Sequence, residues 1–172
     1  MLKPVQALLI LVLATSVGCI STQPSLARSA VPAPATGYVG AIVTKDTVAG
    51  FGLGLRDLAD HDYVLPLENG VVLIALPPGT YRVAYWVTFA ALTHERLTQQ
   101  DIPPAESFAT PFVLAPGHVM LLGDLFSDRL GMFSRTYTIQ TMPISAGDAA
   151  LKFRTEYRGF AAAPIDCLAC TR

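Results

Sequence analysis

Three cysteines are the residues of this chain best suited to covalent chemistry, because a thiolate is both a nucleophile and a metal ligand. Cys19 follows a short apolar run, and Cys167 and Cys170 form a C-x-x-C pair near the end of the sequence. The pair could form a local disulfide, act as a redox couple, or bind zinc with two further ligands from a partner chain. We favour the disulfide, because an exported chain enters an oxidising compartment, and the flanking sequence shows no thioredoxin-like βαβ pattern that a redox couple would need. Haem attachment would need histidine after Cys170, where Thr171 stands.

The first eighteen residues have the features of an export signal. Lys3 supplies one positive charge, residues 7–14 are all apolar, and the run remains short even when it is extended to Val17. A helix that crosses a bilayer needs about 20 apolar residues, so a permanent span is the weaker interpretation. We expect residues 1–18 to be a signal peptide that is removed.

The stretch Ser16-Val17-Gly18-Cys19 resembles the lipobox of bacterial lipoproteins. In that family a diacylglyceryl group is attached to the cysteine sulfur, and a peptidase then cleaves just before the cysteine. Gly18 is the small residue that this cleavage needs, whereas Ser16 departs from the leucine that is usual there. The resemblance implies that Cys19 becomes the lipid-bearing first residue; the alternative is an ordinary signal peptide with a chance cysteine. Because Ile20 rather than an aspartate follows, the same resemblance implies sorting to the outer membrane.

A second group of reactive side chains lies in residues 56–62, which read RDLADHD. Three carboxylates and an imidazole could coordinate a divalent cation, and the candidate ligands are Asp57, Asp60, His61 and Asp62. Their spacing matches neither a calcium-binding loop nor a zinc signature. We therefore favour a solvated turn that is held by local aspartate hydrogen bonds.

Trp86 could stack on a sugar or a peptide if its ring were exposed. It lies in residues 81–89, where the alternation predicts Tyr81, Tyr85 and Phe89 on one strand face and Trp86 on the other. A buried Trp86 would instead belong to the core, which is the interpretation that we favour.

The overall composition excludes several classes of protein. The chain of 172 residues is 52% hydrophobic and only 15% charged, with a formal net charge of −1. This composition argues against a disordered chain, and the lack of a basic excess argues against a nucleic-acid partner. The sequence contains no G-x-S-x-G motif and no P-loop, and it predicts no cofactor.

Most of the elements that would position these residues are predicted strands. Period-two alternation or short apolar runs indicate strands at residues 38–44, 51–58, 71–76, 81–89, 112–115, 118–122 and 135–142. Pro77-Pro78-Gly79 and Pro116-Gly117 are turn signals, and we expect each to close a hairpin. In residues 50–55, which read GFGLGL, the apolar side chains should face the core while the glycines allow a close approach on the other face. Residues 97–111 are expected to form a long loop.

One helix is predicted near the end of the chain. Ser145 is a suitable N-cap, and apolar residues recur at helical spacing from Ala149 to Phe160. Residues 21–36, rich in Ser, Ala and Pro, predict a disordered or semi-stiff tether between the membrane and the folded domain. The chain then divides into a signal peptide (1–18), a lipidated cysteine with its tether (19–37), a β-sandwich with its C-terminal helix (38–163) and a tail with the C-x-x-C pair (164–172).

The predicted fold is all-β: an antiparallel β-sandwich of about seven or eight strands with one short C-terminal helix. The stretches VVLIALPPGTYRV and FVLAPGHVMLLGDL resemble the paired hairpins of transthyretin-like, or carboxypeptidase-regulatory-like, β-sandwich domains. This resemblance covers roughly residues 38–142 and implies a compact sandwich that binds or supports a partner. The shared residues are structural, so the resemblance assigns no binding site.

Together these features predict a non-enzymatic, lipid-anchored protein of the bacterial cell envelope that acts by contact with an envelope protein or a glycan. One alternative is a ligand-binding module with a metal at the 57–62 turn or a sugar at Trp86. Another is a thiol–disulfide protein that uses Cys167 and Cys170.

Overall fold

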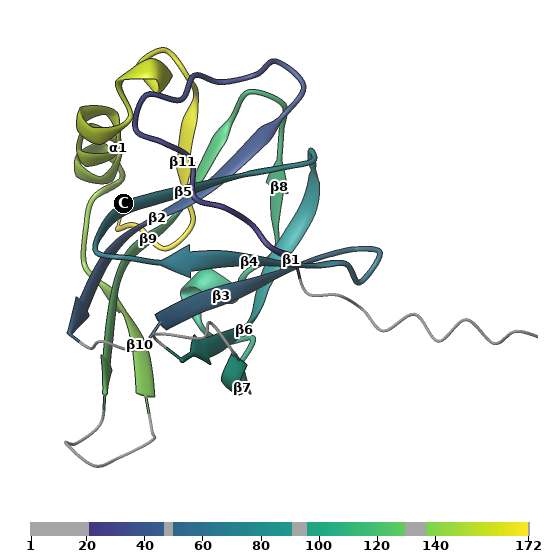
Figure 1. The fold of residues 1–172 in the computed structure, drawn as a ribbon. Coiled ribbons are helices and arrows are strands. Elements are labelled where there is room, and N and C mark those ends of the chain that lie inside the picture. Colours follow the sequence, from purple (N-terminus) through teal and green to yellow (C-terminus); the bar gives the residue numbers. More distant parts are fainter. Residues whose placement is uncertain (1–20, 47–49, 91–95, 130–136, 172) are drawn as a thin grey trace, which may run out of the picture.

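The computed structural model describes residues 21–46, 50–90, 96–129 and 137–171. The predicted signal peptide and Cys19 lie outside these residues. In the described part of the chain, no helix is long and apolar enough to cross a membrane. Two β-sheets pack face to face, and one helix covers the outer side of the second sheet (Figure 1). The predicted all-β fold with a short C-terminal helix is confirmed.

The first sheet has six strands, in the order β1-β4-β3-β6-β7, with β8 beside the first part of β6. The second has five, in the order β10-β9-β2-β5, with β11 beside the first part of β9. The strands of the first sheet are β1 (Ser21–Thr22), β3 (Gly50–Asp57), β4 (Asp62–Leu67), β6 (Gly79–Phe89), β7 (Arg96–Asp101) and β8 (Phe112–Leu114). Those of the second are β2 (Gly37–Asp46), β5 (Gly70–Leu76), β9 (Val119–Arg129), β10 (Tyr137–Met142) and β11 (Ile165–Cys167).

The described residues contain eleven strands rather than seven or eight. Strands β1 and β11 have only two or three residues, too few to show an alternating pattern. Strand β4 contains Pro66, and β7 is polar and lies at a sheet edge, so neither resembles a buried strand in sequence. Most strand pairs are antiparallel as predicted, but β1 with β4, β2 with β9 and β11 with β9 are parallel.

The two proline–glycine turns do not close hairpins, and that prediction is wrong. Strand β5 belongs to the second sheet and β6 to the first, so Pro77-Pro78-Gly79 carries the chain across the sandwich. Pro116-Gly117 does the same between β8 and β9. Turn residues indicate that the chain reverses, but they do not specify which sheet receives the next strand. The antiparallel hairpins of the structure are β3–β4, β6–β7 and β9–β10.

The core between the sheets includes Phe51, Leu53 and Leu55, as the GFGLGL stretch predicts. Gly54 lies on the opposite face of β3, directly beneath the ring of Tyr85. A Cβ atom at position 54 would come within 2.2 Å of that ring, so only glycine allows this close approach.

Strand β6 contains a β-bulge at Ala84. Gly54 pairs with Tyr85 and the next residue, Leu55, pairs with Val83, which leaves Ala84 without a cross-strand partner. Val83 and Trp86 consequently face the core, whereas Tyr85 faces outward. The prediction that Tyr81 and Tyr85 share a face is wrong, because one inserted residue inverts the alternation.

Helix α1 (Ala146–Glu156) begins where predicted. The hydroxyl of Ser145 accepts a hydrogen bond from the backbone N–H of Asp148 at 3.0 Å, so Ser145 is the N-cap. Short 3-10 helices lie at η1 (Ser107–Ala109) and η2 (Arg158–Phe160). A second core, called here the helical core, lies on the outer face of the second sheet. It combines side chains of β2, β5 and β9 with those of α1 and η2. These buried residues are Tyr38, Ile42, Val71, Leu73, Val119, Leu121, Ala149, Phe153, Tyr157, Phe160 and Ala163.

Residues 21–36, called here the N-terminal segment, are packed on the domain, which corrects the prediction of a free tether. Its backbone pairs with the edge strand of each sheet: Gln23 donates to the carbonyl of Val64 on β4, and Leu26 donates to that of Leu73 on β5. Figure 1 shows this course in purple, from β1 past β5. The composition did not reveal it, because the bonding groups belong to strand edges that would otherwise be unpaired.

Side chains at the end of α1, together with the backbone of β5, also hold the N-terminal segment in place. The guanidinium of Arg28 donates to the carbonyl of Val71 and forms an ion pair with Glu156 at 2.9 Å, while the carboxylate of Glu156 accepts from the N–H of Val71 at 3.3 Å. The hydroxyl of Tyr157 donates to the carbonyl of Leu26 at 3.0 Å. Both hydrogen-bonding groups of Val71 that point away from the sheet are thereby satisfied.

Residues 164–172 were predicted to be a separate tail, but their described part belongs to the domain. Strand β11 pairs with β9, and beyond it the N–H of Leu168 donates to Leu121 and that of Thr171 donates to Ile144.

Gly159 tests the packing of the N-terminal segment. A Cβ atom there would lie 2.3 Å from the carbonyl oxygen of Ala30, so Gly159→Ala should push the segment away and lower the free energy of unfolding by about 1–3 kcal/mol. The matched control is Gly147→Ala, in the first turn of α1, where the nearest atom is 3.8 Å away. That change should be neutral or stabilising by up to about 1 kcal/mol. Urea unfolding of both variants measures the difference, and equal stability of Gly159→Ala and the unchanged protein would contradict this packing.

Candidate functional site

A cleft of about 230 Å³ opens at the side of the sandwich opposite the N-terminal segment. Strands β7 and β10, at the far ends of the two sheet orders, form its sides, and the connection from β7 to η1 completes it. The lining residues are Trp86, Gln100, Asp101, Ile102, Pro103, Glu106, Phe108, Thr138 and Ile139.

Backbone hydrogen bonds fix the connection from β7 to η1. The N–H of Ile102 donates to the carbonyl of Ala84 at 3.0 Å, which ties the end of β7 to the bulge in β6. The N–H groups of Glu106 and Ala109 then donate to carbonyls three residues earlier. The bulge thus shapes the cleft in two ways: it holds the end of β7, and it turns Trp86 toward the core.

The lining combines an apolar base with polar groups at the rim. Trp86, Ile102 and Phe108 are buried, and Trp86 packs against Phe51 with the ring centroids 6.1 Å apart. Gln100 and Glu106 are exposed and offer an amide and a carboxylate. Such a surface suits a small group that carries hydroxyls or amides on an apolar ring or stem.

The volume limits what the cleft can hold. It is below the roughly 300–1,000 Å³ that is typical of small-molecule sites, so it fits one ring or one side chain of a larger partner. The described lining residues include no Ser, Cys or His, and therefore supply no ordinary pairing of a nucleophile with a histidine base.

Trp86 itself is only 7% exposed, so a ligand cannot lie flat on its ring. The residue forms part of the core and part of the cleft wall. The preference for a core Trp86 agrees with this burial. The sequence does not identify Gln100, Asp101, Glu106 and Thr138 as cleft residues. It predicts a loop at residues 97–111, and the two sheets bring together residues that are distant in the chain.

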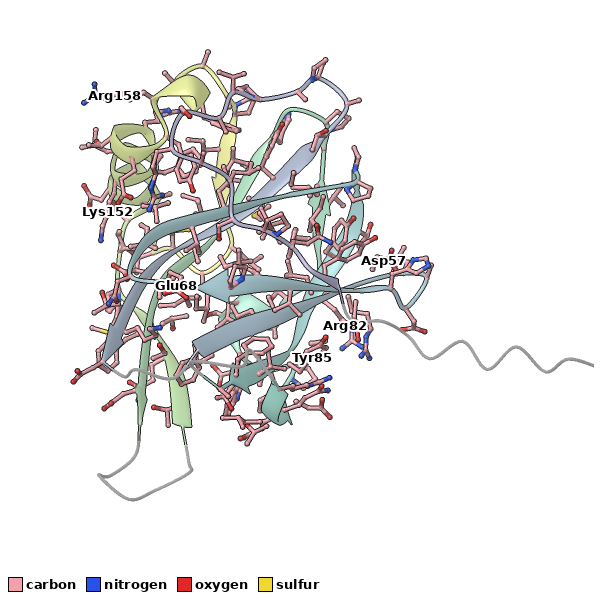
Figure 2. All side chains as sticks on the ribbon, viewed as in Figure 1. Asp57, Glu68, Arg82, Tyr85, Lys152 and Arg158 are labelled. Carbon is pink, nitrogen blue, oxygen red and sulfur yellow. A yellow bond between two sulfur atoms is a disulfide. The ribbon has the colours of Figure 1, made fainter. Side chains whose placement is uncertain are left out.

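The predicted metal candidates lie where β3 leads into β4: Asp57, labelled in Figure 2, ends β3, and Asp62 begins β4, with Asp60 and His61 between them. The carboxylate of Asp57 accepts hydrogen bonds from the N–H groups of Ala59 at 2.8 Å and His61 at 2.9 Å, and its other oxygen lies 3.0 Å from the His61 ring. Burial alone would raise the pKa of Asp57, but these hydrogen bonds outweigh it and the pKa is lowered. Asp60 adopts a left-handed conformation with φ of 61°.

The carboxylate of Asp62 is also hydrogen-bonded. Its two oxygens accept from the guanidinium of Arg56 at 2.8 and 3.2 Å, and the side-chain hydrogen bond raises the pKa of Arg56. Across the described residues, no group of three or more His, Cys, Asp or Glu side chains is placed to hold a metal ion. The hydrogen bonds that Asp57 accepts from the backbone are of the local kind that the sequence predicts for this turn.

Cys167 and Cys170 are joined by a disulfide, with their Cα atoms 5.5 Å apart. Cys167 ends strand β11, and both cysteines pack at the margin of the helical core. The pair does not begin a helix, so it lacks the helix N-terminus that lowers a catalytic thiol pKa. The disulfide joins the end of β11, which pairs with β9, to the residues that follow it.

Comparison with known proteins adds no functional assignment. No model of a protein family matches the chain, and no curated protein matches it. One solved structure is similar in part: a leucine-rich repeat protein from Bacteroides thetaiotaomicron, with 15% sequence identity and a TM-score of 0.32. The match covers 56% of this chain and 14% of that protein, and the similarity is too low to bear on fold or function.

Proposed function

We propose that this chain is a non-enzymatic, lipid-anchored protein of the bacterial cell envelope, at the outer membrane, whose β-sandwich binds an envelope glycan or protein through the cleft at Trp86. The observation that carries the proposal is the contrast between the two sides of the sandwich. The N-terminal segment pairs with the edge strands on one side, whereas the cleft lies open on the other.

Two further observations support binding rather than catalysis. The described lining residues of the cleft offer hydrogen bonds but no histidine that could act as the base for a nucleophile. The disulfide links a strand to a turn and contributes to structure. The lipobox-like sequence at Cys19 supports the membrane anchor, and the relationship to transthyretin-like domains stays a prediction.

A glycan is the partner that the lining favours, since buried apolar groups beside amide and carboxylate groups suit the two kinds of surface on a sugar ring. Trp86 is the single tryptophan of the chain, so its fluorescence reports directly on the cleft. Titration of the mature protein with soluble fragments of envelope polysaccharides should change this emission in a saturable way.

Neighbouring glutamines on β7 provide a matched pair of variants. Gln100 lines the cleft opposite Trp86, whereas Gln99 is exposed on the other face of the strand. Gln100→Ala should weaken binding about fivefold, because a hydrogen bond contributes about 1 kcal/mol net, and Gln99→Ala should leave it unchanged. Equal affinities for both variants would contradict the cleft as the contact site.

A further inference from the structure

The direction of β1 determines where the lipid anchor meets the domain. Strand β1 is parallel to β4, with Ser21 opposite Tyr63 and Thr22 opposite Val64. Since β4 starts at the turn that follows β3, the chain enters β1 from the end of the sheet where this turn lies.

The chain between the anchor and the domain is short. Cys19 precedes Ser21 by two residues, which even fully extended span about 7 Å. Residues after Ser21 add no reach, because the backbone of Gln23 and Leu26 and the side chain of Arg28 are bonded to the sheet edges. A lipid on Cys19 would hold this end of the sheet close to the bilayer surface.

The surface at this end has the composition of a membrane-contacting rim. Leu58, in the turn after β3, is 84% exposed, and Val113 on β8 is 71% exposed. Both lie near the start of β6, since Asp57 pairs with Tyr81 and Thr80 pairs with Val113. A small pocket of about 70 Å³ between Leu58 and Pro111 places the turn beside the connection that leads into β8.

The charges at this rim are compatible with lipid headgroups. Arg56 is paired with Asp62, and the carboxylate of Asp57 accepts hydrogen bonds from the backbone N–H groups of Ala59 and His61, so two of the three carboxylates at this turn are already bonded within it. Arg82, labelled in Figure 2, is exposed and can reach a phosphate. An exposed leucine beside an arginine suits the boundary between headgroups and acyl chains.

We propose that the bilayer itself occupies this surface: the domain rests with the turn between β3 and β4 against the headgroups, which fixes its orientation. This inference rests on the proposed lipidation of Cys19. The cleft lies at the other edge of the sandwich, and Trp86 is four residues beyond Arg82 along β6, about 13 Å of strand. The orientation therefore presents the cleft away from the membrane surface.

The test uses the full mature protein, purified from membranes and placed in phosphatidylethanolamine–phosphatidylglycerol vesicles with a nitroxide-labelled headgroup. A fluorophore is attached to Leu58→Cys at the rim, or to Leu97→Cys on β7 as the control, since both side chains are exposed. The disulfide protects Cys167 and Cys170 from labelling. The probe at position 58 should lose much of its fluorescence, whereas the probe at position 97 should keep most of it.

A second variant separates orientation from anchoring. Insertion of about 20 glycine and serine residues between Ile20 and Ser21 adds roughly 25 Å of reach. It should reduce quenching at position 58 to the level at position 97. Equal quenching at both positions without the insertion would overturn the orientation alone, whereas failure to float with vesicles would contradict the anchor and the orientation together.

Discussion

Replacement of Cys19 by serine is expected to move this protein out of the membrane fraction. Only a thiol accepts the diacylglyceryl group, and two acyl chains at ~0.8 kcal/mol per buried CH₂ hold a protein on a bilayer persistently. Without them the variant should remain an unprocessed precursor or appear as soluble protein. Expression in the native host, fractionation of the membranes and immunoblotting measure both its location and its size.

The other two cysteines provide the control for Cys19→Ser. The double variant Cys167→Ser/Cys170→Ser removes the disulfide but leaves the proposed anchor unchanged, so it should still fractionate with membranes at the mature size. Membrane-bound Cys19→Ser protein of mature size would contradict the lipid anchor.

Truncation of Phe153 is expected to give the largest loss of stability among the substitutions considered. Phe153 is fully buried at the centre of the helical core, and its ring lies 5.3 Å from that of Tyr157 and 5.9 Å from that of Phe160. Phe153→Ala should lower the free energy of unfolding by about 3–5 kcal/mol through lost burial and the cavity that remains. Since domains of this kind are stable by about 5–15 kcal/mol, this is a large fraction of the total.

The matched control for Phe153→Ala is Leu151→Ala on the same helix. Leu151 is 66% exposed, so its removal should change the free energy of unfolding by no more than about 0.5 kcal/mol. Urea denaturation followed by circular dichroism measures both variants. Similar midpoints for the two would show that α1 is not an integral part of the fold.

The sequence predicted features that depend on local chemistry. Ser145 has the side chain of an N-cap, and the alternation of Phe51, Leu53 and Leu55 shows which face of β3 is buried. These features need only neighbouring residues, and the structure confirms them. The all-β class follows from the same local patterns repeated along the chain.

Features that depend on distant partners were not predicted. The N-terminal segment is ordered because the edges of β4 and β5 need hydrogen-bond partners, a requirement that its own composition does not express. The bulge at Ala84 arises from pairing with β3, and it exchanges the faces of Tyr85 and Trp86 relative to the simple alternation. Because this bulge also ties the end of β7 in place, the cleft could not be identified from the sequence either.

The packing of the N-terminal segment changes what a lipid anchor would do. A free tether would let the domain sample many orientations, whereas a segment bonded from Gln23 onward leaves only a short link to Cys19. Gly159→Ala, which should push this segment away from the domain, should therefore lower the stability of the domain and also loosen its orientation on the membrane.

Mass spectrometry of the amino-terminal peptide from protein purified out of native membranes tests the proposed anchor most directly. The predicted result is a peptide that begins at Cys19 and carries a diacylglyceryl group on its sulfur. An unmodified Cys19 thiol, or a retained leader of residues 1–18, would contradict it.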